Sequence, residues 1–114
     1  MLPKTPKRNL RRRGHAPVFA ALGDDTRLAI VARLAEGQRC SIAELTQGTS
    51  VTRQAVTKHL RVLEEARIVR SARAGREVRF TLDAAPIREA RDYAAMVSDK
   101  WDDALGRLKA LVER

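Results

Sequence analysis

Residues 41–82 read SIAELTQGTSVTRQAVTKHLRVLEEARIVRSARAGREVRFTL. Ser41 followed by Glu44 is a capping box, which predicts a short helix. Thr52 is a suitable N-cap for a second helix, which we expect to end near Ala66. Two runs with strand character follow, separated by a glycine. A short helix, a turn, a second helix and a β-hairpin in this order predict a winged helix-turn-helix.

The second of these helices has one apolar face and one cationic face. Val56, Leu60 and Leu63 recur at helical spacing, so they should pack inward. An α-helix fits the major groove of B-DNA, where Gln can pair with adenine and Arg or Lys with guanine. A solvated helix face is the alternative for any single residue. The residues expected to contact DNA, the last of them at a phosphate, are Thr52, Arg53, Gln54, Thr57, Lys58 and Arg61.

The hairpin is expected to have strands at Ile68–Arg73 and Arg76–Leu82. Gly75, between them, can adopt the positive φ that a tight turn requires. Apolar and polar side chains alternate in the second strand, which predicts one buried and one exposed face. The residues expected inward are Val78, Phe80 and Leu82, and those expected outward are Glu77, Arg79 and Thr81.

Four arginines surround this turn, namely Arg70, Arg73, Arg76 and Arg79. A basic wing can lie along the DNA backbone or enter the minor groove, where the potential is most negative. The same arginines could instead keep an edge strand soluble. We expect them to contact DNA, because the hairpin directly follows the cationic helix.

The net charge of +9 is concentrated in two segments. Residues 1–14 carry six basic and no acidic residues, and residues 50–82 carry eight basic and three acidic residues. Such clustering is typical of a surface that binds a polyanion. We expect residues 1–14 to be a disordered basic tail, acting either as a DNA-contacting arm or only as a solubilising or expression-derived extension.

Two helices are expected before this region and one after it. The first covers about Pro17–Leu22, and Asp24 can cap the next, which Gly37 should end. The inward stripe of that second helix should comprise Leu28, Ile30, Val31 and Leu34.

The last helix is expected to begin near Pro86, which is tolerated in a first turn. Its apolar residues alternate at spacings of three and four over more than three heptads, as in a coiled coil. They are Ile87, Ala90, Ala94, Val97, Trp101, Ala104, Leu108 and Leu111. At about 40 Å, this helix is longer than a small core can cover. We therefore expect a second copy to cover it, the alternative being packing within its own domain. The expected dimer contacts are Phe19, Val97, Trp101, Leu105, Leu108 and Leu111.

At these residues the chain resembles the ArsR family of dimeric winged-helix transcriptional regulators. The resemblance is carried by residues 21–28 (ALGDDTRL), 52–63 (TRQAVTKHLRVL), 65–69 (EARIV) and 75–77 (GRE). It implies a homodimer, built on the first and last helices, that represses promoters until a signal releases it.

The chain departs from the family pattern in two places. Arg67 stands where the family usually has glycine, and a left-handed conformation there would cost about 1 kcal/mol. Ser41 and Ala43 stand at the thiolate positions of metal-sensing members, and Cys40 is one place away. One cysteine and two histidines cannot close a four-ligand zinc site within one chain. We therefore expect no metal and no other cofactor. The helix that follows Thr52 is similar to the recognition helix of the family, and we expect its residue His59 to pack beneath it or touch phosphate.

We thus expect a mainly α chain of three parts: a tail (1–14), a winged helix-turn-helix domain (15–85) and a dimerisation helix (86–114). The expected function is a homodimeric, sequence-specific repressor acting on double-stranded DNA. The alternative is an architectural DNA-binding protein indifferent to sequence. An enzyme is disfavoured, because no nucleophile–base set or phosphate-binding loop is present. A lone Cys40 is more typical of a buried residue than of a thiol sensor. Without a membrane-length apolar stretch or a signal peptide, we expect a cytoplasmic protein.

Overall fold

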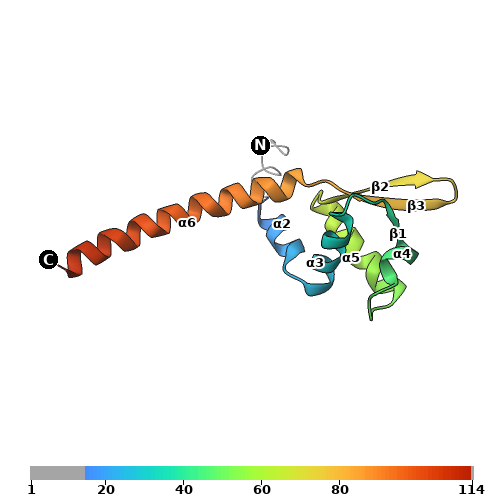
Figure 1. Ribbon diagram of the computed structural model, residues 1–114, viewed down its shortest axis with the longest axis horizontal. Helices are drawn as coiled ribbons and strands as arrows, with labels where there is room; N and C mark the ends of the chain where they lie inside the picture. Colours follow the sequence, from blue (N-terminus) through green and yellow to red (C-terminus); the bar gives the residue numbers. More distant parts are fainter. Residues whose placement is uncertain (1–14, 114) are drawn as a thin grey trace, which may run out of the picture.

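The computed structural model describes residues 15–113, so the expected basic tail lies outside the described residues. The chain is mainly helical with one small antiparallel sheet, as the sequence predicted (Figure 1). Its elements are α2 (His15–Leu22), α3 (Asp25–Leu34), β1 (Cys40–Ser41), α4 (Ile42–Thr46), α5 (Arg53–Glu65), β2 (Val69–Ala74), β3 (Glu77–Leu82) and α6 (Ala85–Val112).

The sheet has the strand order β1-β3-β2. β2 and β3 form the expected hairpin, in which Ala74 pairs with Glu77 and Gly75 has a φ of +67°. The turn is one residue later than expected, because β2 continues to Ala74. β1 was not predicted: its two residues pair with β3, Cys40 opposite Phe80. A strand of two residues is too short to show an alternating pattern.

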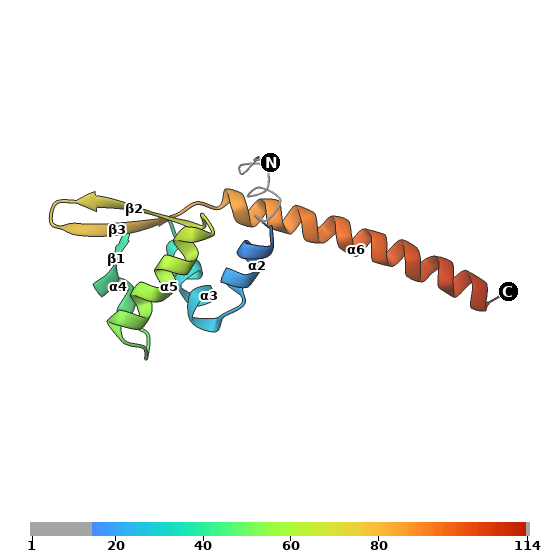
Figure 2. The same ribbon diagram turned by 180° about the vertical axis from the view of Figure 1, so that it is seen from behind.

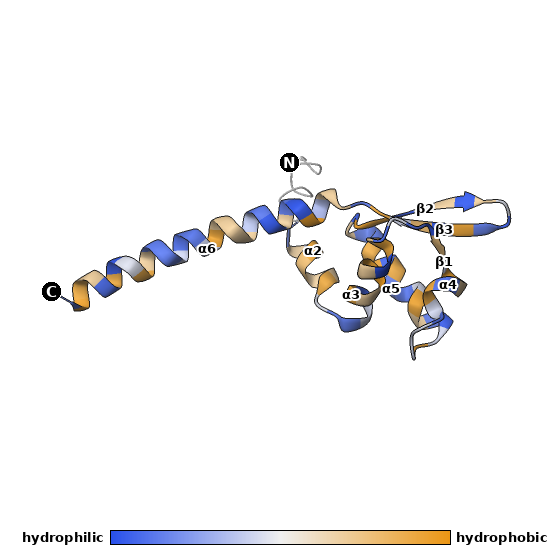
Figure 3. Ribbon diagram, in the orientation of Figure 1, coloured by the Kyte–Doolittle hydropathy of each residue, from blue (hydrophilic) through white to orange (hydrophobic). Residues whose placement is uncertain are grey.

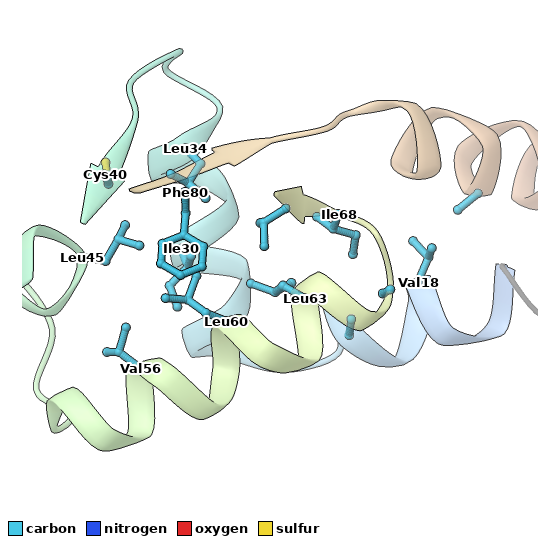
Figure 4. Close-up of a cluster of buried hydrophobic side chains, with 14 residues drawn as sticks. Val18, Ile30, Leu34, Cys40, Leu45, Val56, Leu60, Leu63, Ile68 and Phe80 are labelled. Carbon is cyan, nitrogen blue, oxygen red and sulfur yellow. The ribbon is translucent and has the colours of Figure 1, made fainter. Parts of the chain in front are cut away.

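The core lies where the helices α2 to α5 meet the base of the sheet (Figure 4). The expected inward face of α5 is confirmed, since Val56, Leu60 and Leu63 are buried. Ile68 and Phe80 bring the base of the hairpin into the same cluster. Because one face of α5 is anchored in this way, its opposite face is left for solvent or a ligand.

Two residues expected to be inward are exposed. Leu28 is 47% exposed, because the inward row of α3 is Arg27, Ile30 and Leu34, which places an arginine where the sequence suggested a leucine. Val78 is 40% exposed, because the hairpin extends beyond the core and only its base is covered. Figure 2 shows the hairpin projecting away from the helices.

Helix α6 begins with proline in its first turn, as expected, and packs on α2 only near its start. Ala90 is its buried residue. The remainder extends away from the body and gives the molecule principal-axis extents of 68 × 43 × 22 Å (Figures 1 and 2). Apolar and polar residues alternate along it (Figure 3). None of the helices between residues 15 and 113 combines the length and the hydropathy that a transmembrane helix needs.

Candidate nucleic-acid interface

The recognition helix α5 is capped as the sequence predicted. The Thr52 hydroxyl accepts a hydrogen bond from the Ala55 backbone N–H at 3.1 Å, which satisfies one of the free donors at the start of the helix. Burial of the apolar face leaves Arg53, Gln54, Lys58 and Arg61 exposed, with Thr57 half-buried. These side chains occupy the face that was expected to contact DNA.

Thr57 differs from its neighbours because its hydroxyl donates to the Arg53 carbonyl at 2.9 Å. A hydroxyl has one proton to donate, so the proton of Thr57 is used inside the helix. The two lone pairs of its hydroxyl oxygen and its methyl group are the features that Thr57 can offer to a base.

Five of the seven cations on α5 and the hairpin form no ion pair within residues 15–113. They are Arg53, Lys58, Arg61, Arg73 and Arg76. The outer part of the hairpin is coloured largely hydrophilic (Figure 3). Unpaired guanidinium and ammonium groups at this density repel one another, so a bound polyanion would relieve that repulsion.

The other two hairpin arginines form ion pairs with carboxylates of the protein. Arg70 pairs with Asp83 at 2.8 Å, in the junction between β3 and α6. The Ala85 backbone N–H and the Arg70 guanidinium hold the pKa of Asp83 below its ordinary value of 3.8. Arg70 therefore has a partner in the protein and is less available to DNA than Arg73 or Arg76.

Arg79, expected outward, is half-buried and joins β3 to the neighbouring helix α4. Its guanidinium lies 2.9 Å from Glu77, 3.3 Å from Glu44 and 3.0 Å from the Arg39 carbonyl. The Arg79 side chain therefore folds back onto the body of the protein, which could not be foreseen because Glu44 is 35 residues away. This contact attaches the wing to the first helix of the helix-turn-helix.

Glu44 completes the predicted capping box. Its carboxylate accepts from the Ser41 backbone N–H at 2.9 Å, and the Ser41 hydroxyl accepts from the Glu44 N–H at 3.2 Å. The Ser41 N–H and the charge of Arg79 hold the pKa of Glu44 below its ordinary value of 4.5. One carboxylate thus orders the start of α4 and anchors the wing.

His59 packs behind the recognition helix, one of the two places expected for it. Its Nδ1 lies 3.1 Å from Nη1 of Arg27 and 3.8 Å from Oδ2 of Asp24. Asp24 is the predicted N-cap of α3, and the Arg27 backbone N–H is the largest cause that holds its pKa below the ordinary value of 3.8. The role of Arg27 was missed, although the spacing of Arg27, Ile30 and Leu34 marks one helical row.

The donor set around the first helix of the motif does not match a metal site. Ser41 is occupied as a helix cap, Ala43 has no donor atom, and Cys40 is only 2% exposed, with its thiol 4.0 Å from the Gln38 carbonyl. Among residues 15–113, no three His, Cys, Asp or Glu side chains are grouped to hold a metal ion.

Comparison with known proteins matches the same region. Residues 22–72 match the family described as helix-turn-helix domain. The uncharacterized HTH-type transcriptional regulator YuzN of Bacillus subtilis (strain 168) is 45% identical over 65 residues, covering 52% of this chain and 71% of that protein. The HTH-type transcriptional regulator Rv2034 of Mycobacterium tuberculosis (strain ATCC 25618 / H37Rv) is 36% identical over 97 residues, covering 75% and 90%.

A solved structure agrees with these relatives. An ArsR-like transcriptional regulator from Rhodococcus sp. RHA1 has a TM-score of 0.77 and 32% identity, covering 89% of this chain and 94% of that chain. These relatives and the fold that the chain shares with them identify a DNA-binding transcriptional regulator, a class of protein that is not enzymatic. The chain belongs to the ArsR family of winged helix-turn-helix regulators.

Proposed function

We propose that this regulator is a homodimeric repressor that binds a specific operator in double-stranded DNA. The observation that carries the proposal is the exposed face of α5, where Gln54 and Thr57 lie among the cations Arg53, Lys58 and Arg61. Phosphate binding alone needs only cations, whereas the amide of Gln54 and the acceptor oxygen and methyl group of Thr57 suit base edges. A cytoplasmic location follows from this role.

The proposed dimer is supported by the exposed stripe on α6. Trp101 is 64% exposed, and Leu105, Leu108 and Leu111 are exposed along the same helix. Contiguous apolar surface of this kind is typical of an interaction site. Phe19 on α2 is also exposed, and Val97 is half-buried. All six residues expected at the interface are therefore accessible, fully or partly, to a second copy.

We further propose that the signal releasing the repressor is not a metal ion bound at α4. The support is chemical: the aligned positions hold a capping serine and an alanine, and the one thiol nearby is buried. A soft metal would need thiolates or imidazoles in those places.

Selection of bound sites from genomic DNA, including the chain's own upstream region, would supply the operator for a direct test. The selected duplex should then displace labelled DNA far better than random duplex at physiological salt, since specific sites typically bind about 10³-fold or more tighter. Equal affinity for both would contradict a sequence-specific repressor. That result would favour the second candidate, an architectural DNA-binding protein, which the cationic surface alone could support.

The two parts of the interface should respond differently to substitution. Gln54→Ala should weaken binding to the selected site by about 1–3 kcal/mol for a base pair that it recognises, with little effect on random duplex. Arg76→Ala should weaken both, and should lower the slope of log affinity against log salt by about one for each phosphate that Arg76 neutralises. Titration of both duplexes at several salt concentrations measures the affinity of each variant for each duplex and its dependence on salt. If Gln54→Ala weakened binding to random duplex as much as Arg76→Ala does, the result would contradict a role for Gln54 in base recognition.

A further inference from the structure

One guanidinium joins three helices behind the recognition face. Arg27 of α3 donates through Nε to the Ala21 carbonyl at 2.6 Å and through Nη2 to the Ala20 carbonyl at 3.4 Å. Both carbonyls belong to the last turn of α2, where backbone acceptors lack partners within the helix. The remaining nitrogen, Nη1, lies 3.1 Å from Nδ1 of His59 on α5.

The Arg27–His59 contact suits one form of the imidazole. Arginine has donors and no acceptor, so a hydrogen bond here needs a lone pair on Nδ1, which the neutral imidazole with its proton on Nε2 provides. The His59 side chain is 21% exposed, so water can deliver a second proton. Histidine is the side chain whose charge ordinarily changes between about pH 5 and 8.

Protonation would exchange the partner of His59. An imidazolium donates from both nitrogens, so Nδ1 could no longer accept from Arg27, and two cations would lie 3.1 Å apart. Asp24, 3.8 Å away, would attract the imidazolium instead. The charged groups within 4 Å of His59 are Arg27 on α3 and Asp24, the N-cap of α3, and the α2 carbonyls of Ala20 and Ala21 accept from Arg27. On α5 itself, the residues one turn away are apolar: Ala55, Val56, Val62 and Leu63.

We propose that Arg27 and His59 are positioning residues for operator recognition, and that proton uptake by His59 releases the recognition helix from α2. We call the Arg27–His59 hydrogen bond, together with the two hydrogen bonds from Arg27 to α2, the latch. The proposal rests on the proposed function. His59 lies two positions after Thr57 on α5, so the latch sets the rotation of the helix that presents Gln54 and Thr57. Because α2 carries Phe19 of the proposed dimer interface, the latch also relates the recognition helix to the dimer axis.

Lower pH should reduce the preference for the selected site, whereas added positive charge alone would strengthen DNA binding. Added positive charge strengthens binding to any DNA, whereas an opened latch misplaces the side chains that contact bases. The preference for the selected site over random duplex should therefore fall by roughly 2- to 30-fold between about pH 8 and about pH 5.5. Binding to random duplex should stay equal or increase.

Four forms of the full chain test this proposal on both duplexes at both pH values. His59→Asn places an amide oxygen near the position of Nδ1 and does not titrate, so its preference should be high at both. His59→Leu has no acceptor and should show the low preference at both. His15→Asn removes the other histidine, which stacks on Tyr93 at 4.6 Å, and should respond to pH like the unsubstituted protein.

The results separate the latch from the proposed function. A pH response in His59→Asn equal to that of the unsubstituted protein would overturn the latch, as would an unsubstituted protein whose preference ignores pH. If the unsubstituted protein lacks any preference at about pH 8, the proposed repressor itself is contradicted. Circular dichroism checks that each variant is folded. If His59→Leu does not fold, the comparison of His59→Asn with the unsubstituted protein still tests the latch.

Discussion

Arg67 has a left-handed backbone, with φ of +66°, directly after the recognition helix. Its N–H donates to the Glu64 carbonyl at 2.9 Å, and the N–H of Ile68 donates to the Leu63 carbonyl at 2.9 Å. These two bonds form a Schellman motif, in which the left-handed position usually holds glycine. Ile68 and Leu63 are both buried, so this ending directs the chain into the wing. The arginine is therefore accommodated at a conformational cost.

Replacing Arg67 with glycine should remove that cost. Arg67→Gly should raise the free energy of unfolding by about 1 kcal/mol, which corresponds to a rise in Tm of roughly 4–8 °C for a domain of this size. Thermal and urea denaturation measure the change. Arg67→Ala is the matched control, because it removes the guanidinium but keeps the β-carbon. An equal gain in Arg67→Ala would assign the effect to charge and not to the backbone.

Among the elements, the wing is attached more firmly than a free hairpin. β1 pairs with β3 at Cys40 and Ser41, and Arg79 of β3 contacts Glu44 of α4. Where the wing joins α6, Arg70 pairs with Asp83. These contacts hold the base of the wing, while Arg73 and Arg76 remain at its outer end. The position of the wing relative to α5 is thus built into the fold.

The attachment through Glu44 should make stability sensitive to acid. Its pKa is lower in the folded protein than its ordinary value of 4.5, chiefly because of the Ser41 N–H. The carboxylate therefore stabilises the fold above that value, and the contribution is lost as the pH falls through the lowered folded pKa. Glu44→Gln, which cannot titrate, should show a shallower loss of stability below about pH 4.5 in urea titrations.

Asp24 and Asp83 provide the reference for this comparison. Their pKa values are also lowered, so they leave a residual acid dependence in both proteins. Identical slopes for Glu44→Gln and the unsubstituted chain would show that Glu44 does not contribute to the acid response.

For the whole molecule, the long exposed helix α6 is the dominant feature. It contacts the body near its start and carries an apolar stripe beyond it (Figure 3). Burying one large apolar side chain contributes about 1.5–3 kcal/mol, so several on each copy could support association. A dimer would present two recognition helices, as two half-sites of one operator require.

Trp101→Asp should break the proposed dimer, because it places a charge in the middle of the stripe. Sedimentation should show a monomer, and affinity for the selected operator should fall by about 10²- to 10⁴-fold when two-site binding is abolished. Asp103→Lys is the control: it also changes charge but lies about 200° around the helix from Trp101, and it should remain a dimer. A Trp101→Asp variant that still sediments as a dimer would contradict this interface.

The sequence by itself determined those features whose causes are local. The capping of α4 by Ser41 and Glu44 and of α5 by Thr52 involves groups three residues apart. The periodic spacing of Val56, Leu60 and Leu63 predicted the buried face of α5, and with it the exposed cationic face. Neighbouring residues on a helix are related by its geometry alone, so no tertiary information was needed.

Only the tertiary structure decided which polar side chains have a partner within the protein and which do not. Arg79 meets Glu44 across 35 residues, and Arg27 meets His59 across 32 residues. β1 forms only because Cys40 pairs with Phe80 on β3, a strand far from it in the sequence. Local periodicity says which way a side chain points, but its partner depends on how the elements pack. For that reason the cationic face could be predicted from the sequence, while the latch behind it could not.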